Sequence, residues 1–139
     1  MNIEHLSEEE LKDSILQKQL QWIKLCQDNF IIFAETVWQD FIYRKTKDPK
    51  KWGHHQIIAE AFEGVADGDE KRLIINMPPR HTKSEFASYL FPAWFIGKYP
   101  KKKIMQVSHN AELASRFGSK VRNLMNTKEY KEIFGNVQL

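Results

Sequence analysis

The chain has 139 residues, 42% of them hydrophobic, which is enough for one modest globular domain with a buried core. It holds no run of 18 apolar residues, which excludes a transmembrane helix, and its acidic first residues lack the apolar stretch of a secretion signal. Cys26 is the only cysteine, which excludes an internal disulfide and is typical of a reducing compartment, where a lone cysteine is usually a small core residue.

The net charge of +3 conceals an asymmetry between the two halves of the chain. Residues 1–70 hold 8 Lys/Arg and 14 Asp/Glu, whereas residues 71–139 hold 13 Lys/Arg and 4 Asp/Glu. A basic half joined to an acidic half indicates that the second half meets phosphate, in a nucleotide or a nucleic acid. A solvated charged face is the plainer alternative.

The N-terminal region predicts two helices. Ser7 and Glu10 form a capping box, and apolar residues recur at helical spacing over 7–25. A second stretch, 28–43, carries a wide aromatic-rich stripe that favours core packing: Phe30, Phe33, Ala34, Val37, Trp38 and Phe41. A charged connector broken by Pro49 follows over 44–53, and a third helix is predicted over 54–68, ended by glycines and acidic residues.

The pattern changes after residue 70. The apolar run 72–76 predicts a buried strand, and an apolar helix is expected over about 83–96, bent or ended by Pro92. A second buried strand is predicted over 103–108, followed by a helix over 109–125 capped by Ser108 or Asn110. We therefore expect an α/β fold in which N-terminal helices (1–48) precede a βαβ unit with a parallel sheet (49–139).

The loop between the first predicted strand and its helix, NMPPRHTKSE, ends in Lys83 and Ser84. The general phosphate loop is G-x-x-x-x-G-K-[ST], and its two glycine positions fall here on Met77 and Thr82. Lys83 can supply the cation and Ser84 the hydroxyl for Mg²⁺, but Thr82 would adopt a backbone conformation that costs about 1–3 kcal/mol. The pattern alone leaves a nucleotide site and a basic surface turn both open.

Three segments in order resemble the large terminase subunits of tailed bacteriophages, the motors that package DNA into proheads. The loop INMPPRHTKSE is similar to the family's phosphate loop, in which two prolines and an arginine precede the ending. WGHHQIIAEAF resembles its upstream adenine-recognition segment, and KIMQVSHNAELASRFGSKVRNLM resembles its second strand and following helix. The resemblance covers about residues 50–135 and implies a phosphate-loop ATPase unit of the RecA/ASCE type that binds ATP and Mg²⁺.

The resemblance also implies roles for single residues. Lys83 would hold the β- and γ-phosphates, Ser84 would ligate Mg²⁺, and Arg80 would lie beside the γ-phosphate and stabilise charge in the transition state. Gln56 would hydrogen-bond the adenine, with Trp52 nearby. Pro79, His81 and Thr82 complete the nucleotide-binding loop, although the His81 side chain is expected to face water.

Two other groups of residues are weaker candidates for a binding site. His54, His55, His81 and His109 are too scattered in the predicted topology to indicate zinc. A basic run over 98–103, with further basic residues downstream, has the composition of a DNA-contacting surface, but such runs are more often solvated loops. The residues concerned are Lys98, Lys101, Lys102, Lys103, Arg116, Lys120 and Arg122.

A phosphate-loop motor also needs a second strand that ends in carboxylates, which would order Mg²⁺ and activate water. The only acidic residues beyond Glu112 are Glu129 and Glu132, in a polar segment expected to be exposed. We therefore expect the N-terminal piece of a longer protein, with an incomplete sheet that is marginally stable or associates.

The resemblance thus implies the ATP-binding part of a viral DNA-packaging motor in the host cytoplasm. Its expected partners are duplex DNA, a portal ring, a small terminase subunit and further copies in a ring, without a membrane. The alternatives are a fragment of a helicase-like ATPase and a non-catalytic binding module.

Overall fold

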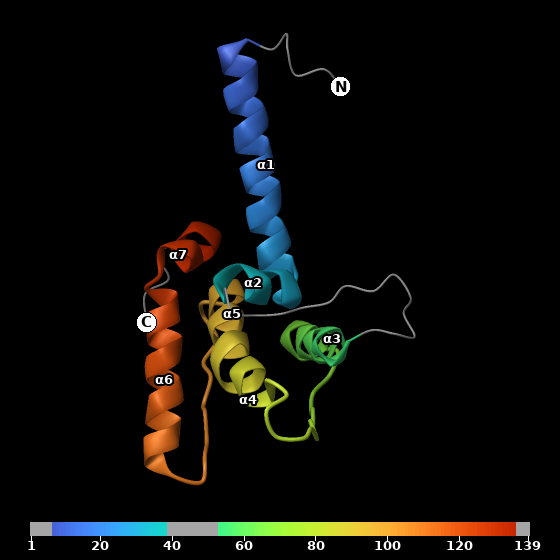
Figure 1. Cartoon of the computed structure of the whole chain (residues 1–139), viewed down its shortest axis with the longest axis vertical. Helices are drawn as coiled ribbons and strands as arrows, with labels where there is room; N and C mark the ends of the chain where they lie inside the picture. The colour runs from blue at the N-terminus through green and yellow to red at the C-terminus, as the bar shows by residue number, and fades with distance from the viewer. Residues whose placement is uncertain (1–6, 39–52, 136–139) are drawn as a thin grey trace.

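The protein is described by a computed structural model over residues 7–38 and 53–135, and every regular element in these two ranges is a helix (Figure 1). The prediction of an α/β fold with a parallel sheet is therefore wrong for this part of the chain, which is all-α. The expected domain boundary at 48/49 lies outside the described residues, as do Phe41 and Trp52. The helices are α1 (Glu8–Asp28), α2 (Phe30–Val37), α3 (His54–Asp67), α4 (Lys83–Glu85), the π-helical turn η2 (Phe86–Leu90), α5 (Phe91–Lys98), α6 (Ala111–Met125) and α7 (Lys128–Phe134).

The two predicted strands are extended segments, over 72–78 and 102–108, that form no ladder with each other or with any other described residue. A strand needs a neighbour about 4.8 Å away, and in Figure 1 the two segments lie on either side of the continuous helix formed by α4, η2 and α5. Their apolar side chains are correspondingly open: Ile74 is 86% exposed and Met105 87%. The prediction that these two runs are paired, buried strands is therefore wrong.

An aromatic cluster shared by α2, α3, η2 and α5 forms the centre of the core. The Phe30 ring lies 5.4–5.8 Å from four other rings, three of them edge-on. Its ring neighbours are Phe62, Phe86, Phe91 and Trp94. Phe30, Phe33 and Ala34 are all fully buried, so the core role predicted for this stripe is confirmed for those residues. Cys26 is also buried, as expected.

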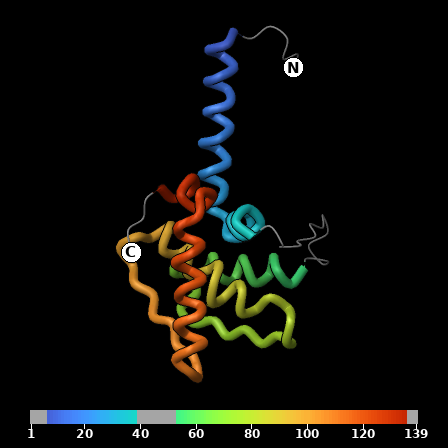
Figure 2. Tube along the Cα trace, turned by 60° about the vertical axis from the view of Figure 1, so that its left-hand side comes forward, coloured from blue at the N-terminus to red at the C-terminus, as the bar shows by residue number. Residues whose placement is uncertain are grey.

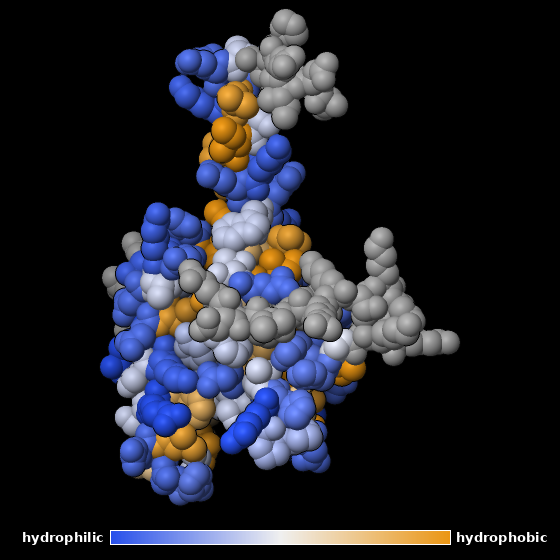
Figure 3. All heavy atoms as spheres, viewed as in Figure 1, coloured by the Kyte–Doolittle hydropathy of each residue, from blue (hydrophilic) through white to orange (hydrophobic). Residues whose placement is uncertain are grey.

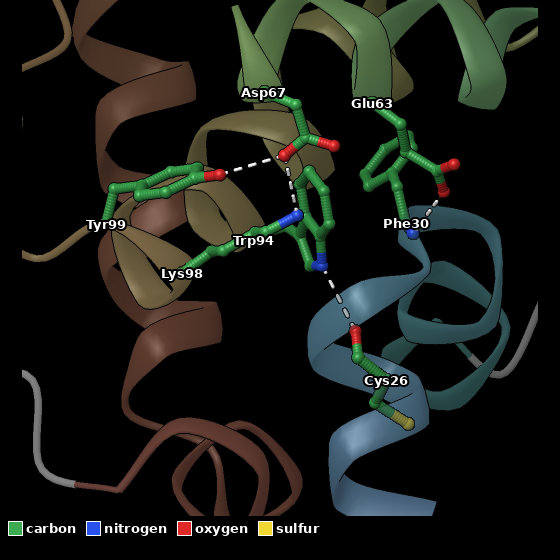
Figure 4. Close-up of polar contacts among 7 residues, drawn as sticks. All are labelled: Cys26, Phe30, Glu63, Asp67, Trp94, Lys98 and Tyr99. Carbon is green, nitrogen blue, oxygen red and sulfur yellow. Dashed lines mark hydrogen bonds and ion pairs between the residues drawn. The ribbon is translucent and has the colours of Figure 1, made fainter.

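Polar contacts tie the same helices together around Trp94 (Figure 4). The Trp94 indole donates to the backbone oxygen of Cys26 at 3.1 Å, which joins α5 to α1. Asp67, near the end of α3, accepts hydrogen bonds from Lys98 Nζ at 2.9 Å and from the Tyr99 hydroxyl at 2.8 Å, and both lower the pKa of its carboxyl group. These contacts fix α5 against both of its neighbours.

Glu63 replaces a missing helix cap. Asn29 makes no side-chain hydrogen bond to the start of α2, and the Glu63 carboxylate of α3 accepts instead from the Phe30 N–H at 2.7 Å. The first N–H groups of a helix have no partner within the helix, so an external acceptor stabilises it. Burial nevertheless raises the pKa of Glu63, against the opposing effect of this hydrogen bond.

The raised pKa predicts a pH dependence that a Glu63→Gln variant removes. The folded protein holds the Glu63 proton above the ordinary pKa of 4.5, so this group's contribution to stability falls as pH rises from about 4.5 through the raised value. Glutamine keeps an oxygen for the Phe30 N–H and does not titrate. We expect urea unfolding between about pH 4 and 7 to show the variant gaining stability relative to wild type as pH rises. Glu129→Gln, at an exposed position on α7, serves as the control, and parallel curves for wild type and Glu63→Gln would contradict the assignment.

Pro92 lies inside the helix and is accommodated without ending it. Directly before it, η2 is a π turn, in which a backbone N–H donates to the carbonyl five residues back and not four. Here Phe91 N donates to Phe86 O. Proline has no N–H for the carbonyl four residues back, which is that of Ser88. Gln106 Nε2 donates to that oxygen instead, at 3.1 Å, and so attaches the 102–108 segment to the helix. The expected bend at Pro92 is therefore a π turn.

The C-terminal helices pack beside α5. Asn110 caps α6 by accepting from Leu113 N at 2.8 Å, so the second of the two predicted caps is correct. Figure 2 shows the 102–108 segment leading to the start of this helix. The region expected to be polar and exposed instead forms α7, whose Tyr130 and Ile133 are buried. The Tyr130 hydroxyl donates to Ala93 O at 2.8 Å, and Gln27 Nε2 donates to Ile133 O at 2.6 Å.

The N-terminal helix α1 projects from the rest of the molecule (Figure 1). Its capping box is present, with Ser7 N donating to Glu10 Oε2 at 2.8 Å and Glu10 N to Ser7 Oγ at 3.3 Å. Its apolar residues at helical spacing are largely exposed, with Leu16 at 52%, and are visible as orange spheres in Figure 3. None of the helices described is both long and apolar enough to cross a membrane.

Candidate functional site

The loop that precedes α4 has an unusual backbone. Arg80 (φ 65°) and Thr82 (φ 61°, ψ 6°) both lie in the left-handed region, which non-glycine residues rarely adopt. Thr82 is β-branched, so the strain predicted at the position of the missing glycine is present, at a cost of about 1–3 kcal/mol. Such outliers persist only where surrounding contacts hold them, and they cluster at binding sites.

This backbone presents N–H groups at the start of a helix. Within the ranges 7–38 and 53–135, the N–H groups of Lys83 and Ser84 donate to no acceptor. The helical hydrogen bonds begin with Phe86 N, which donates to Thr82 O at 3.0 Å. Left-handed residues next to right-handed ones turn successive N–H groups toward one point, which suits an anion.

Lys83 and Ser84 are the first residues of the helix. Lys83 is half-buried and Ser84 exposed, and the Lys83 ammonium forms no ion pair within the part of the chain that the structure describes. The next residue, Glu85, is paired with Lys120 of α6 at 3.2 Å. A cation and a hydroxyl thus stand beside the unpaired N–H groups.

The other loop residues are arranged around this point. Pro79, Arg80 and His81 are exposed. His81 Nδ1 donates to Pro79 O at 2.9 Å, so the ring folds back on its own loop, and its exposure agrees with the expectation that it faces water. Arg80 makes no ion pair among the described residues, which leaves its guanidinium able to reach an anion at the loop.

The first turn of α3 lies against the loop. His55 Nε2 is 2.7 Å from Thr82 Oγ1, and the His54 and His81 rings are 5.7 Å apart. Gln56, the expected adenine ligand, is the next residue, is half-buried, and donates from Nε2 to Glu60 Oε1 at 3.3 Å. The structure therefore brings the first turn of α3 and the loop over residues 76–84 together.

His55 is the site residue that the sequence analysis missed. In the sequence it is one of several scattered histidines, and its contact with the loop joins residues 27 positions apart. The sequence offers no signal for this contact beyond its position next to Gln56.

A cavity of about 700 Å³ lies beside the loop, with Lys83 and Ser84 in its lining. Leu73 and Ile75 of one extended segment and residues 103–107 of the other form its walls, and α3, η2 and α5 contribute Phe62, Ala87 and Phe91. Its lining is mainly apolar, so it does not itself resemble a phosphate site.

The residues present fit a magnesium nucleotide only in part. In the described ranges no three His, Cys, Asp or Glu side chains gather to hold a metal ion. Mg²⁺ bound to a nucleotide takes most of its ligands from phosphate oxygens and water, and needs few from protein. Ser84 can give one hydroxyl ligand, while the N–H groups and Lys83 match the phosphates.

The basic residues proposed for DNA divide into two groups. Lys98 is held by Asp67 and lies over the Trp94 ring, and Lys120 is held by Glu85, so both serve the fold. Lys101, Lys102 and Lys103 are exposed at the start of the second extended segment, and Arg116 and Arg122 are exposed on α6.

Comparisons of the chain with protein-family profiles, with curated proteins and with solved structures found no match.

Proposed function

We propose that the loop over residues 76–84 binds the phosphates of Mg-ATP, and that the chain is the ATP-binding part of a viral DNA-packaging motor of the large terminase type. One observation supports the nucleotide site: left-handed residues at Arg80 and Thr82 lead into a helix start where the N–H groups of Lys83 and Ser84 have no acceptor among the described residues. A basic surface turn has no need of that strained backbone.

The proposed roles follow from the chemistry of each group. Lys83 places a positive charge at the β- and γ-phosphates, and Ser84 gives a hydroxyl ligand to Mg²⁺. Arg80 reaches the γ-phosphate from the solvent side of the loop, and Gln56 hydrogen-bonds the adenine from the start of α3. When bound, Mg²⁺ neutralises charge on the phosphate oxygens.

The wider assignment rests on the resemblance of the three segments. It has the motor act in the cytoplasm of the infected host, on duplex DNA, with a portal ring, a small terminase subunit and copies of itself as partners. Among the basic residues considered for DNA, the exposed Lys101, Lys102, Lys103, Arg116 and Arg122 would meet its phosphates.

A Lys83→Ala variant tests the nucleotide site. Calorimetric titration of the wild-type protein with Mg-ATP is expected to show binding, and the variant is expected to lose about ten- to a hundredfold in affinity, because it loses a charge-assisted hydrogen bond worth about 1.5–3 kcal/mol. Lys101→Ala, an exposed lysine outside the loop, should bind like wild type. EDTA should weaken wild-type binding, since Ser84 would then have no ion to ligate. Absence of binding by folded wild-type protein would refute the proposal.

A further inference from the structure

The hydrogen bond between His55 and Thr82 has a defined direction. The Thr82 hydroxyl donates its one proton to the His81 backbone oxygen at 2.6 Å, so toward His55 it can only accept. His55 Nε2, 2.7 Å away, must therefore carry the hydrogen. The His55 side chain thus holds the Thr82 side chain, at the position where the phosphate-loop pattern has glycine.

Thr82 needs such a contact because its own conformational preference opposes the loop. A left-handed backbone brings Cβ close to the following peptide, and branching at Cβ adds to that crowding. Glycine adopts the same conformation at no steric cost. Thr82 is half-buried, whereas the four residues before it in the loop are exposed, so few neighbours along the chain can hold it.

His55 is itself held firmly enough to act as this support. It lies in the first turn of α3, and its ring stacks on the fully buried Phe86, with centroids 5.4 Å apart and planes 22° apart. Burial, with smaller contributions from His54 and His81, lowers the pKa of His55 to about 4. The imidazole is therefore neutral at physiological pH.

We propose that His55 is a positioning residue that holds Thr82 in the left-handed conformation, and so replaces the glycine that phosphate loops otherwise use. This inference rests on the proposed nucleotide site for its functional meaning. The contact would also link the protein groups proposed for the two ends of the nucleotide. It connects the helix that carries Gln56, proposed for the adenine, to the loop that carries Lys83, proposed for the phosphates.

Three variants separate the hydrogen bond from the packing. His55→Phe keeps a ring to stack on Phe86 and loses the donor. His55→Gln keeps an N–H donor at the same distance along the side chain and loses the ring. Thr82→Gly removes the need for any support, because glycine reaches the left-handed region unaided.

Titration with Mg-ATP provides the first measurement. We expect His55→Phe to bind about three- to tenfold more weakly than wild type, the equivalent of one hydrogen bond, and His55→Gln to recover most of that loss. In a Thr82→Gly background, adding His55→Phe should change the affinity by less than about twofold. An equal loss in both backgrounds would overturn the inference, because His55 would then act on the ligand and not through Thr82.

Limited trypsin digestion provides a measurement that needs no nucleotide. Arg80 and Lys83 are cleavage sites within the loop, and Lys102, in an exposed segment elsewhere, is an internal reference. His55→Phe should speed cleavage at the two loop sites relative to Lys102, while His55→Gln should match wild type. If wild type fails to bind Mg-ATP, the proposed function fails, and these rates still decide whether His55 holds the loop. Unchanged rates in His55→Phe would overturn the inference.

Discussion

Replacing Phe30 with alanine is expected to lower the free energy of unfolding by about 3–5 kcal/mol, the range for removing a large buried aromatic side chain. Phe30 is fully buried, and its ring lies among four others contributed by α3, η2 and α5. Alanine would remove these ring contacts and leave a cavity, which the remaining rings could fill only by giving up their own packing, such as the stack of Phe62 on Phe91. Domains are typically stable by only 5–15 kcal/mol, so the variant would lose a large share of its stability.

Urea unfolding followed by circular dichroism measures this effect. Leu16→Ala is the matched control, because it also shortens an apolar side chain but at a position on α1 that is 52% exposed. The control should change stability by no more than about 0.5 kcal/mol. A loss below about 1 kcal/mol for Phe30→Ala would mean that the aromatic cluster is not the centre of the core.

Replacing Gly97 with alanine is expected to destabilise the protein by about 1–3 kcal/mol through overpacking. A Cβ atom at Gly97 in α5 would lie 2.5–2.7 Å from three ring atoms of Phe134 in α7. The Phe134 ring is itself packed against Phe33 and Tyr130, with centroid distances of 5.6 and 5.1 Å, so it has little freedom to move. Closure of α7 onto α5 therefore depends on the absence of a side chain at this position.

Gly118→Ala is expected to have the opposite effect on stability to Gly97→Ala, and so serves as its control. Gly118 lies within α6, and a Cβ atom there would meet nothing within 4 Å. Alanine is favoured over glycine in a helix by about 0.8–1.0 kcal/mol, so this variant should be more stable than wild type. Gly97→Ala combined with Phe134→Leu should recover part of the lost stability, because leucine is smaller and can turn aside. Thermal unfolding of the four proteins tests the set, and equal gains at Gly97 and Gly118 would contradict the close contact.

The features that the sequence predicted correctly depend on neighbours along the chain. The capping box of Ser7 and Glu10, the Asn110 cap and the end of α3 at Gly68, which has φ 89°, are all local. The strain at Thr82 was also predictable, because it follows from placing a β-branched residue where the loop pattern has glycine.

The features that it predicted wrongly depend on distant partners. Short apolar runs such as 72–76 and 103–108 indicate extended backbone, but only a neighbouring strand makes them a sheet, and the described part of the chain supplies none. The short helix α7 is polar in sequence and was missed, because the burial of Tyr130 depends on its contact with Ala93, 37 residues away. The sequence also does not predict the ion pairs of Lys98 and Lys120, because their acidic partners lie 31 and 35 residues earlier.

The π turn ahead of Pro92 sets the direction in which the loop points. Each residue of an α-helix advances by about 100° around the axis, and a π turn inserts about one extra residue. Lys83 and Ser84 are therefore rotated by about a quarter turn relative to Trp94 and the buried face of α5, compared with an uninterrupted α-helix. The π turn directly before Pro92 thus sets the direction of the loop over residues 76–84 relative to the core, although Pro92 itself is buried nine residues downstream of Lys83.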